Sequence, residues 1–375
     1  MRNVMVEILA RGGTSIAALD HMAKAGPTVE SPLAQQLHSL AACAPSNVPV
    51  VSLYLNLTPD ANGRDAYDAF CRRVFADSLE SSSAPDERAA MAEVFERIQA
   101  YLDSQVQPSA NGLAIFASAG RDGLFETVQL AAPIDEHEFF VGDVPHVFPL
   151  ARLIDQNPRY AAVLLDSNQA RIIVFGLGEV EGREEVTGVK TRRHSKGGWS
   201  QARFRRSIEN AQMHHVKEVV ETLDTIVRAE GIQHVIVAGD EAIVARLREE
   251  LPAQLAEKVV DVLRLDRAAG EEEIVADALE ALRRKDSETD AVRVAEVLDA
   301  WRARGLGVAG REGTRHALER GQVDELLISA APDEAELSNE LVTRAAQTGA
   351  SVRIIEDPEL LREHGGVAAA LRFRI

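Results

Sequence analysis

Apolar and polar positions recur along this chain with two periods, about two residues in short runs and about 3.6 in longer ones, which is typical of mixed α/β structure. Residues 1–32 show little periodicity and are expected to form a loosely ordered lead-in. Residues 33–150 have the pattern of a small α/β domain. We expect strands at 48–57, 112–118 and 124–134 and helices at 64–82 and 85–105.

A second domain is expected over residues 151–286. Three short strand-like runs joined by polar turns, at 160–166, 170–176 and 180–188, predict an antiparallel meander. Alternating helices and strands then follow, and this order resembles the ribonuclease H type of sheet. The expected later elements are a long helix from Arg203 to Glu230, a strand at 234–240, a helix to Leu251, a strand at 258–265 and an acidic helix at 270–285.

The polar stretch at residues 283–291 lacks apolar periodicity and predicts a hinge before a third domain, residues 287–375. Helices and strands alternate regularly in this last section, which is typical of a three-layer α/β/α domain.

The composition is that of a multidomain protein with a core in each domain: 375 residues, 46% of them hydrophobic, and a formal net charge of -18. Apolar runs are too short for a membrane span, and Glu7 interrupts the first one, so we expect no signal peptide, no membrane partner and a cytoplasmic location. The two cysteines, Cys43 and Cys71, cannot build a disulfide framework or a cysteine zinc site and are expected to be buried.

One strongly basic segment, residues 190–206, interrupts the acidic sequence and contains no acidic residue. Its cations are Lys190, Arg192, Arg193, Lys196, Arg203, Arg205 and Arg206. Gly197 and Gly198 allow close approach of the backbone to a ligand, and Trp199, Ser200 and Gln201 add a stacking face, a hydroxyl and an amide. The segment therefore predicts an RNA-binding loop, and a solvated basic loop with an incidental glycine pair is the alternative.

The C-terminal sequence GLGVAGREGTRHALERGQVDELLIS, with ELVTRAAQTGASVRIIED and GGVAAALRFRI, resembles the C-terminal domain of eukaryotic and archaeal release factors, pelota and kink-turn-binding ribosomal proteins. Four residues, Gly310, Glu312, Gly313 and His316, stand where the RNA-binding relatives have Gly-x-Asn-Glu-x-x-Lys. Because three of the four differ and Glu312 would repel phosphate, the resemblance implies a protein-binding version, with a translational GTPase as a possible partner. The alternative is that Gly310 and Gly321 belong only to the turns that flank a core helix and have no role in binding.

The middle section resembles the catalytic domain of the same superfamily, in which a Gly-Gly-Gln loop leads into a long helix and reaches the peptidyl transferase centre. The bacterial relatives of Vms/Ankzf peptidyl-tRNA hydrolases are the branch it resembles, through Gly197, Gly198, Ser200, Arg203 and Phe204. The resemblance implies a three-domain, release-factor-like chain. The first domain contains no asparagine-isoleucine-lysine-serine motif for reading stop codons.

Trp199 occupies the position expected for the glutamine, and the nearest glutamine is Gln201. Ester hydrolysis needs a positioned water and a donor for the oxyanion, which Gln201 and the backbone at Gly197 and Gly198 can supply. Trp199 can instead stack on an RNA base. Two hypotheses stay open: a peptidyl-tRNA hydrolase acting in ribosome rescue, or a non-catalytic A-site binder related to hibernation factors. Both have large-subunit RNA and the tRNA acceptor end as partners.

A metal site has little support in the sequence. Asp166, Glu209 and Asp240 are the carboxylates that a nuclease would use, but Asp166 and Asp240 occupy turn positions. His214 and His215 are adjacent on the expected helix and therefore diverge. We expect neither a metal nor a cofactor.

Overall fold

The computed structural model describes residues 32–59, 67–82, 84–120, 123–176, 179–187, 200–263, 270–331 and 335–374. The described residues divide into two compact units, one formed by residues 158–285 and the other by residues 31–157 together with 286–375. The predicted domain boundaries fall at 150–151, inside one helix, and at 286–287, inside another, whereas the two units divide at 157–158 and 285–286.

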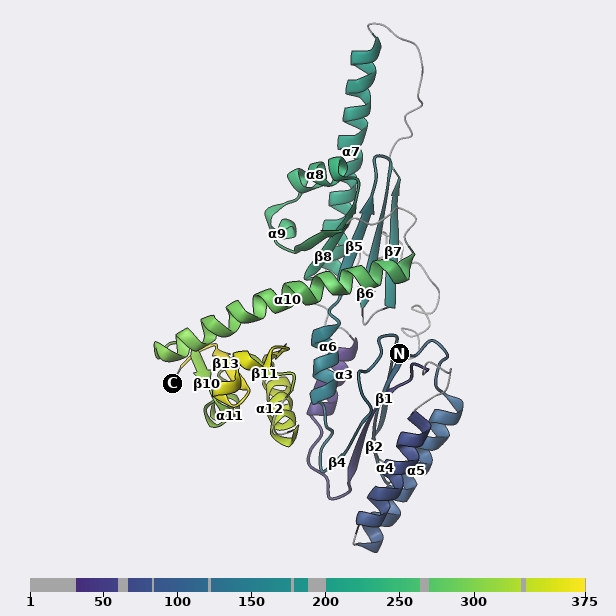
Figure 1. Ribbon diagram of the computed structural model, residues 1–375, viewed down its shortest axis with the longest axis vertical. Helices are drawn as coiled ribbons and strands as arrows, with labels where there is room; N and C mark the ends of the chain where they lie inside the picture. Colours follow the sequence, from purple (N-terminus) through teal and green to yellow (C-terminus); the bar gives the residue numbers. More distant parts are fainter. Residues whose placement is uncertain are drawn as a thin grey trace. The chain divides into compact units, whose positions relative to one another are not determined.

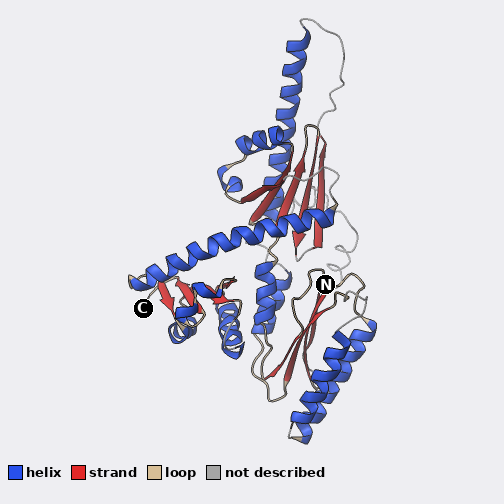
Figure 2. Cartoon of the chain, viewed as in Figure 1, coloured by secondary structure: helices blue, strands red, loops and turns tan. Residues whose placement is uncertain are grey.

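The N-terminal part of the chain forms an antiparallel sheet of order β3-β2-β1-β4 with a helix pair along one face (Figures 1 and 2). These elements are β1 (Val50–Asn56), β2 (Gly112–Ser118), β3 (Phe125–Leu130), β4 (Glu138–Gly142), α4 (Tyr67–Ser81) and α5 (Pro85–Ser104). Alternate residues of β1 and β2 pack against α4 and α5, and the Phe75 and Phe95 rings stack 4.2 Å apart in this core. Cys71 is buried there as expected, but Cys43 is only half-buried.

Two short helices that were not expected from the sequence, α3 (Pro32–Ala41) and α6 (Phe148–Gln156), join this part of the chain to the C-terminal part. The side chain of Asn339 accepts a 2.6 Å hydrogen bond from the backbone N–H of Val147 and donates one of 3.2 Å to the carbonyl of Pro145. Gln347 donates to the carbonyl of Ala41 at 2.6 Å. These bonds explain why residues 31–157 and 286–375 form one unit.

The C-terminal sheet has the order β10-β13-β11-β12 and helices on both faces, which confirms the predicted three-layer domain. Its elements are α10 (Glu271–Arg302), β10 (Gly307–Ala309), α11 (Arg311–Glu319), β11 (Val323–Ser329), α12 (Ala335–Thr348), β12 (Ser351–Ile355), the 3-10 helices η1 (Pro358–Leu360) and η2 (Arg362–His364), and β13 (Val367–Leu371). Val294 and Val297 of α10 pack on Leu327 and Ile355 on one face, and α11 and α12 cover the other.

The predicted hinge at residues 283–291 is wrong in one respect, because α10 continues through it without a break over 32 residues (Figure 1). The stretch contains no glycine or proline, and its residues are compatible with a helix even where few of them are buried. Missing apolar periodicity therefore marks a poorly packed part of a helix and not a loop.

The unit of residues 158–285 has a five-stranded sheet of order β7-β6-β5-β8-β9. Its elements are β5 (Tyr160–Leu165), β6 (Gln169–Gly176), β7 (Glu179–Thr187), α7 (Ser200–Ala229), β8 (His234–Gly239), α8 (Glu241–Glu250), α9 (Ala253–Ala256) and β9 (Val259–Leu263). The first three strands pair antiparallel, and β5-β8 and β8-β9 pair parallel, which confirms the predicted ribonuclease H-like order. One face packs on α7 and α8, and the other on Ile274, Ala278 and Leu282 of α10.

Candidate functional site

The helix α7 begins at Ser200, directly after the Gly-Gly-Trp sequence and three residues before the predicted start. The residues Lys190, Arg192, Arg193, Lys196, Gly197, Gly198 and Trp199 lie outside the described residues. Gln201, Arg203 and Arg205 belong to the first two turns of α7, and only the backbone of these three residues is described. Arg206 is exposed to solvent.

The first half of α7 extends beyond the ends of the strands it packs on, as Figure 1 shows. Among the side chains described, burial begins at His215, and the buried positions are His215, Val216, Val219, Val220, Leu223, Ile226 and Val227. Ala211, one turn before His215, is only half-buried. At about 1.5 Å per residue, the helix places Ser200 roughly 20 Å beyond the first buried turn.

The charge at the start of α7 favours an anionic ligand. Its first turn contains no acidic residue, and the unpaired N–H groups of a helix N-terminus carry a partial positive charge. Seven cations stand within the 17 residues that end at Arg206. The sequence therefore concentrates positive charge directly before α7 and in its first two turns, while the chain as a whole is acidic.

A lateral brace holds the next part of α7. Arg246 of α8 donates a 2.7 Å hydrogen bond to the side chain of Gln212, and Lys217 lies 3.8 Å from the carboxylate of Glu250. His214 is exposed and His215 is buried, so the two rings diverge as predicted.

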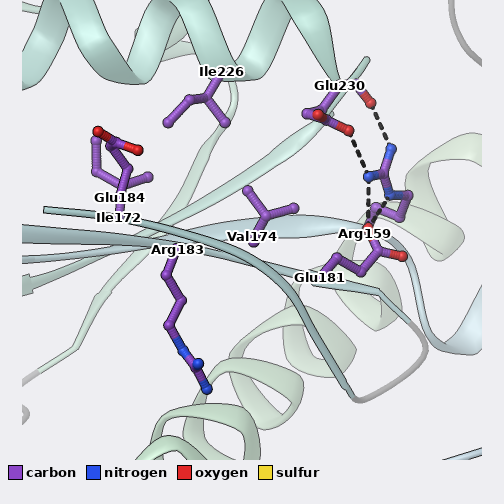
Figure 3. Close-up of a pocket in the computed structure, with 9 residues that line it drawn as sticks. Arg159, Ile172, Val174, Glu181, Arg183, Glu184, Ile226 and Glu230 are labelled. Atoms are coloured by element: carbon purple, nitrogen blue, oxygen red, sulfur yellow. Dashed lines mark hydrogen bonds and ion pairs between the residues drawn. The ribbon is translucent and has the colours of Figure 1, made fainter. Parts of the chain in front are cut away.

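The opposite end of α7 is fixed by Arg159, a residue that no sequence motif singles out (Figure 3). Its guanidinium donates to the backbone carbonyl and to the carboxylate of Glu230, both at 2.8 Å, and to Glu181 of β7 at 2.7 Å. Burial alone would lower the pKa of Arg159, but the hydrogen bonds and charges of Glu230 and Glu181 outweigh this effect and raise the pKa. We call these three residues the Arg159 clamp.

The Arg159 clamp borders a small cavity of about 60 Å³ between β6, β7 and α7. Ile172, Val174 and Ile226 form its apolar wall, whereas Arg183 points away from it in Figure 3. This volume is sufficient for one or two water molecules and not for a nucleotide or peptide. The cavity therefore belongs to the support of α7 and is not a substrate pocket.

The carboxylates considered for a nuclease have local structural roles. Asp166 accepts hydrogen bonds from the backbone N–H groups of Asn168 and Gln169 at 2.6 and 2.9 Å, which fixes the β5-β6 turn. Asp240 caps α8 by accepting from Ala242 at 3.0 Å, and Glu209 is exposed. Within the described ranges, no three His, Cys, Asp or Glu side chains are placed to share a metal ion.

The residues compared with the RNA-reading turn are Gly310, directly before α11, and Glu312, Gly313 and His316 in the first two turns of α11. Gly310 has φ of 87°, a left-handed conformation that favours glycine. The side chain of Glu312 is 78% exposed, 3.7 Å from Arg315, and His316 is exposed as well. Glu312 therefore places a negative charge on the surface of this turn.

The ribonuclease H-like sheet and the long helix α7, with a basic sequence directly before it, form the arrangement that the sequence resemblance implied. Residues 145–283 match the model of the bacterial archaeo-eukaryotic release factor family 10. These matches support the similarity of this chain to the superfamily of release factors and pelota. Peptide chain release factor subunit 1 of Aeropyrum pernix is 28% identical over 285 residues, 71% of this chain and 75% of that protein. The Pyrobaculum aerophilum protein of the same name is 25% identical over 303 residues, 76% and 77% of the two chains.

Solved structures with similarity to this chain include an archaeal translation termination factor, with 20% identity, a TM-score of 0.27 and coverage of 91% of this chain and 97% of that one. A model of ribosome-bound archaeal Pelota and ABCE1 gives 16% identity, a TM-score of 0.42 and coverage of 93% and 96%. Among the described residues, no helix combines the length and the apolar character needed to cross a bilayer.

Proposed function

We propose that this protein associates with the ribosome and hydrolyses peptidyl-tRNA, releasing nascent chains from stalled large subunits. The observation that carries the proposal is the position of the basic segment: it lies inside the family match at 145–283 and leads directly into the projecting end of α7. A helix that extends beyond its sheet is suited to insertion into a confined RNA site.

In this proposal the backbone N–H groups at Gly197 and Gly198 donate to the oxyanion that forms when water attacks the peptidyl ester. The amide of Gln201, in the first turn of α7, orients the water but is too weak a base to deprotonate it. Trp199 stacks on a base of the acceptor end or of ribosomal RNA, and the neighbouring cations contact phosphates. The reaction then needs no metal and no cofactor.

The second candidate is a non-catalytic A-site binder, a hibernation or rescue factor in which the Gly-Gly-Trp sequence acts as a plug. It is favoured by Trp199 at the position expected for glutamine, because an indole can stack but cannot orient water. Release of labelled peptide from stalled large subunits separates the two. Release above buffer supports the hydrolase, and bound protein without release supports the plug.

We also propose a cytoplasmic location and a protein partner for the C-terminal domain, with a translational GTPase as the partner class. One solved relative is described as a translation termination-like factor interacting with Hbs1. In the present chain the exposed Glu312 disfavours phosphate at the turn before α11, which supports a protein ligand there.

Replacing Arg192, Arg193 and Lys196 by Ala is expected to weaken ribosome binding and to flatten its salt dependence. For single-stranded RNA, the slope of log affinity against log salt falls by about 0.7 for each phosphate that is no longer bound. Cosedimentation with ribosomes across a range of salt concentrations measures the slope. The matched control replaces Arg72, Arg248 and Arg283, three cations exposed elsewhere. Equal slopes for wild type and the loop variant would remove the basic segment from the interface.

The full-length protein is expected to bind a kink-turn RNA no more tightly than a straight duplex of the same length, because Glu312 and Gly313 occupy the RNA-reading turn. Competition binding at fixed salt gives the ratio of the two affinities. A clear preference for the kinked RNA would show that the C-terminal domain reads RNA after all.

A further inference from the structure

The unit formed by residues 31–157 and 286–375 contains a group of carboxylates around β12, which we call the β12 junction. Asp155 of α6 accepts a 3.0 Å hydrogen bond from the backbone N–H of Ile354. Asp290 of α10, whose side chain is buried, lies 3.0 Å from Arg353. Each of the two helices thus contacts β12 through one aspartate.

Each arginine at the β12 junction is shared between two carboxylates. Arg353 also contacts Glu325 of β11 at 3.3 Å, and Arg293 of α10 binds Glu325 at 2.6 Å and Glu296 at 3.0 Å. On the α6 side, Glu356 accepts from Gln156 at 2.5 Å and lies 3.8 Å from Arg152. The charged groups at the junction are the carboxylates Asp135, Asp155, Asp286, Asp290, Glu296, Glu325 and Glu356 and the arginines Arg152, Arg293 and Arg353.

Both aspartates retain their protons to unusually high pH. Burial raises the pKa of Asp155 to about 7; the Ile354 N–H and Arg353 oppose the shift, and Asp286 and Asp290 add to it. Burial likewise raises the pKa of Asp290 to about 6, against the opposing effect of Arg353. Near neutral pH the β12 junction is therefore close to the point at which its net charge changes.

We propose that the β12 junction is a proton-dependent latch, in which α6 is held firmly on β12 while Asp155 and Asp290 are protonated and is loosened when they ionise. The position of the latch in the chain gives it a role. Asp155 stands two residues before the passage from one compact unit to the other at 157–158, and Asp286 stands directly after the return at 285–286. Loosening the latch therefore frees the C-terminal end of α6, one residue before the passage at 157–158, whereas α10 continues as a helix through 285–286.

The sign of the pH dependence follows from proton linkage. In the docked state α6 lies on β12, and in the open state it does not. Between the ordinary aspartate pKa and the raised pKa values, the docked state binds more protons than the open state. Docking therefore weakens as pH rises through this window. Above about pH 7.5 both states are ionised and the dependence ends. One carboxyl contributes at most about tenfold in the opening equilibrium per pH unit.

Amide hydrogen exchange of the full-length protein, read by mass spectrometry on peptides covering 148–157 and 351–356 and corrected for intrinsic rates, tests the proposal. We expect opening to become at least about tenfold more favourable from pH 5.5 to 7.5 and to stay constant up to pH 8.5. Asp155→Asn retains an acceptor for the Ile354 N–H but cannot ionise, so its change is expected to be about fivefold or less.

Two further variants sharpen this test. Arg353→Gln removes the cation that faces both aspartates and should extend the pH dependence to higher pH, because Arg353 opposes the rise of both pKa values. Asp143→Asn removes an exposed carboxylate of the same unit and should retain the wild-type profile. A flat wild-type profile overturns the proposal. So does an Asp155→Asn variant with uniformly reduced protection and an unchanged pH dependence, since Asp155 would then be only a structural acceptor.

Discussion

Gln201→Ala is expected to lower the rate of peptide release from stalled large subunits roughly a hundredfold, the scale of loss when a reacting group is no longer held in position. The amide is proposed to orient the attacking water from the first turn of α7, and alanine has no group to replace it. Binding to the subunits should remain close to wild type, because the phosphate contacts are unchanged. Single-turnover release of labelled peptide at saturating protein separates the two effects.

Trp199→Ala should give the opposite result in the same assay. Loss of base stacking weakens binding by about 1–3 kcal/mol and leaves the rate at saturation nearly unchanged. Asn210→Ala is the matched control for Gln201, since it removes an exposed amide from α7 nine positions further along. If wild type, demonstrably bound, releases peptide no faster than buffer, the hydrolase is excluded and the A-site binder is the remaining candidate.

The middle sheet could be predicted from the sequence because its signals are local. The strands β5, β6 and β8 are short apolar runs bounded by turn residues, and Asp166 and Asp240 stand where a turn and a helix cap need them. The same local character made the basic segment visible: its cations are contiguous in sequence, so their grouping does not depend on folding.

The connections between parts of the chain could not be predicted, because they depend on residues far apart in sequence. Asn339 binds the backbone at Pro145 and Val147, 194 and 192 positions away, and nothing in its neighbours marks it for that role. The helices α3 and α6 are only 10 and 9 residues long and are stabilised by packing, not by a long periodic pattern. The Arg159 clamp was missed for the same reason, since its partners lie 22 and 71 positions away.

Arg159→Ala is expected to destabilise the attachment of α7 by about 2–3 kcal/mol, because it leaves Glu181, Glu230 and a helix-terminal carbonyl without their shared donor. This destabilisation is smaller than that for fully buried pairs, since the three side chains are 20–34% exposed. Amide exchange of peptides covering 179–187 and 223–230 should then be roughly 30- to 150-fold faster, and Arg159→Lys should fall between, since one ammonium cannot reproduce the guanidinium fork.

Arg228→Ala is the matched control for this prediction. It removes an arginine two residues from Glu230, and its pair with Asp224 is an exposed i,i+4 contact of 2.9 Å, with 66% of the Arg228 side chain exposed. Such pairs contribute about 0.3–0.5 kcal/mol, so exchange should change by about twofold. If the two alanine variants accelerate exchange equally, the end of α7 is held by apolar packing on Ile226 and Val227, and the Arg159 clamp adds nothing to it. A large difference between them would mean instead that a single guanidinium fixes the base of the helix whose other end follows the basic segment.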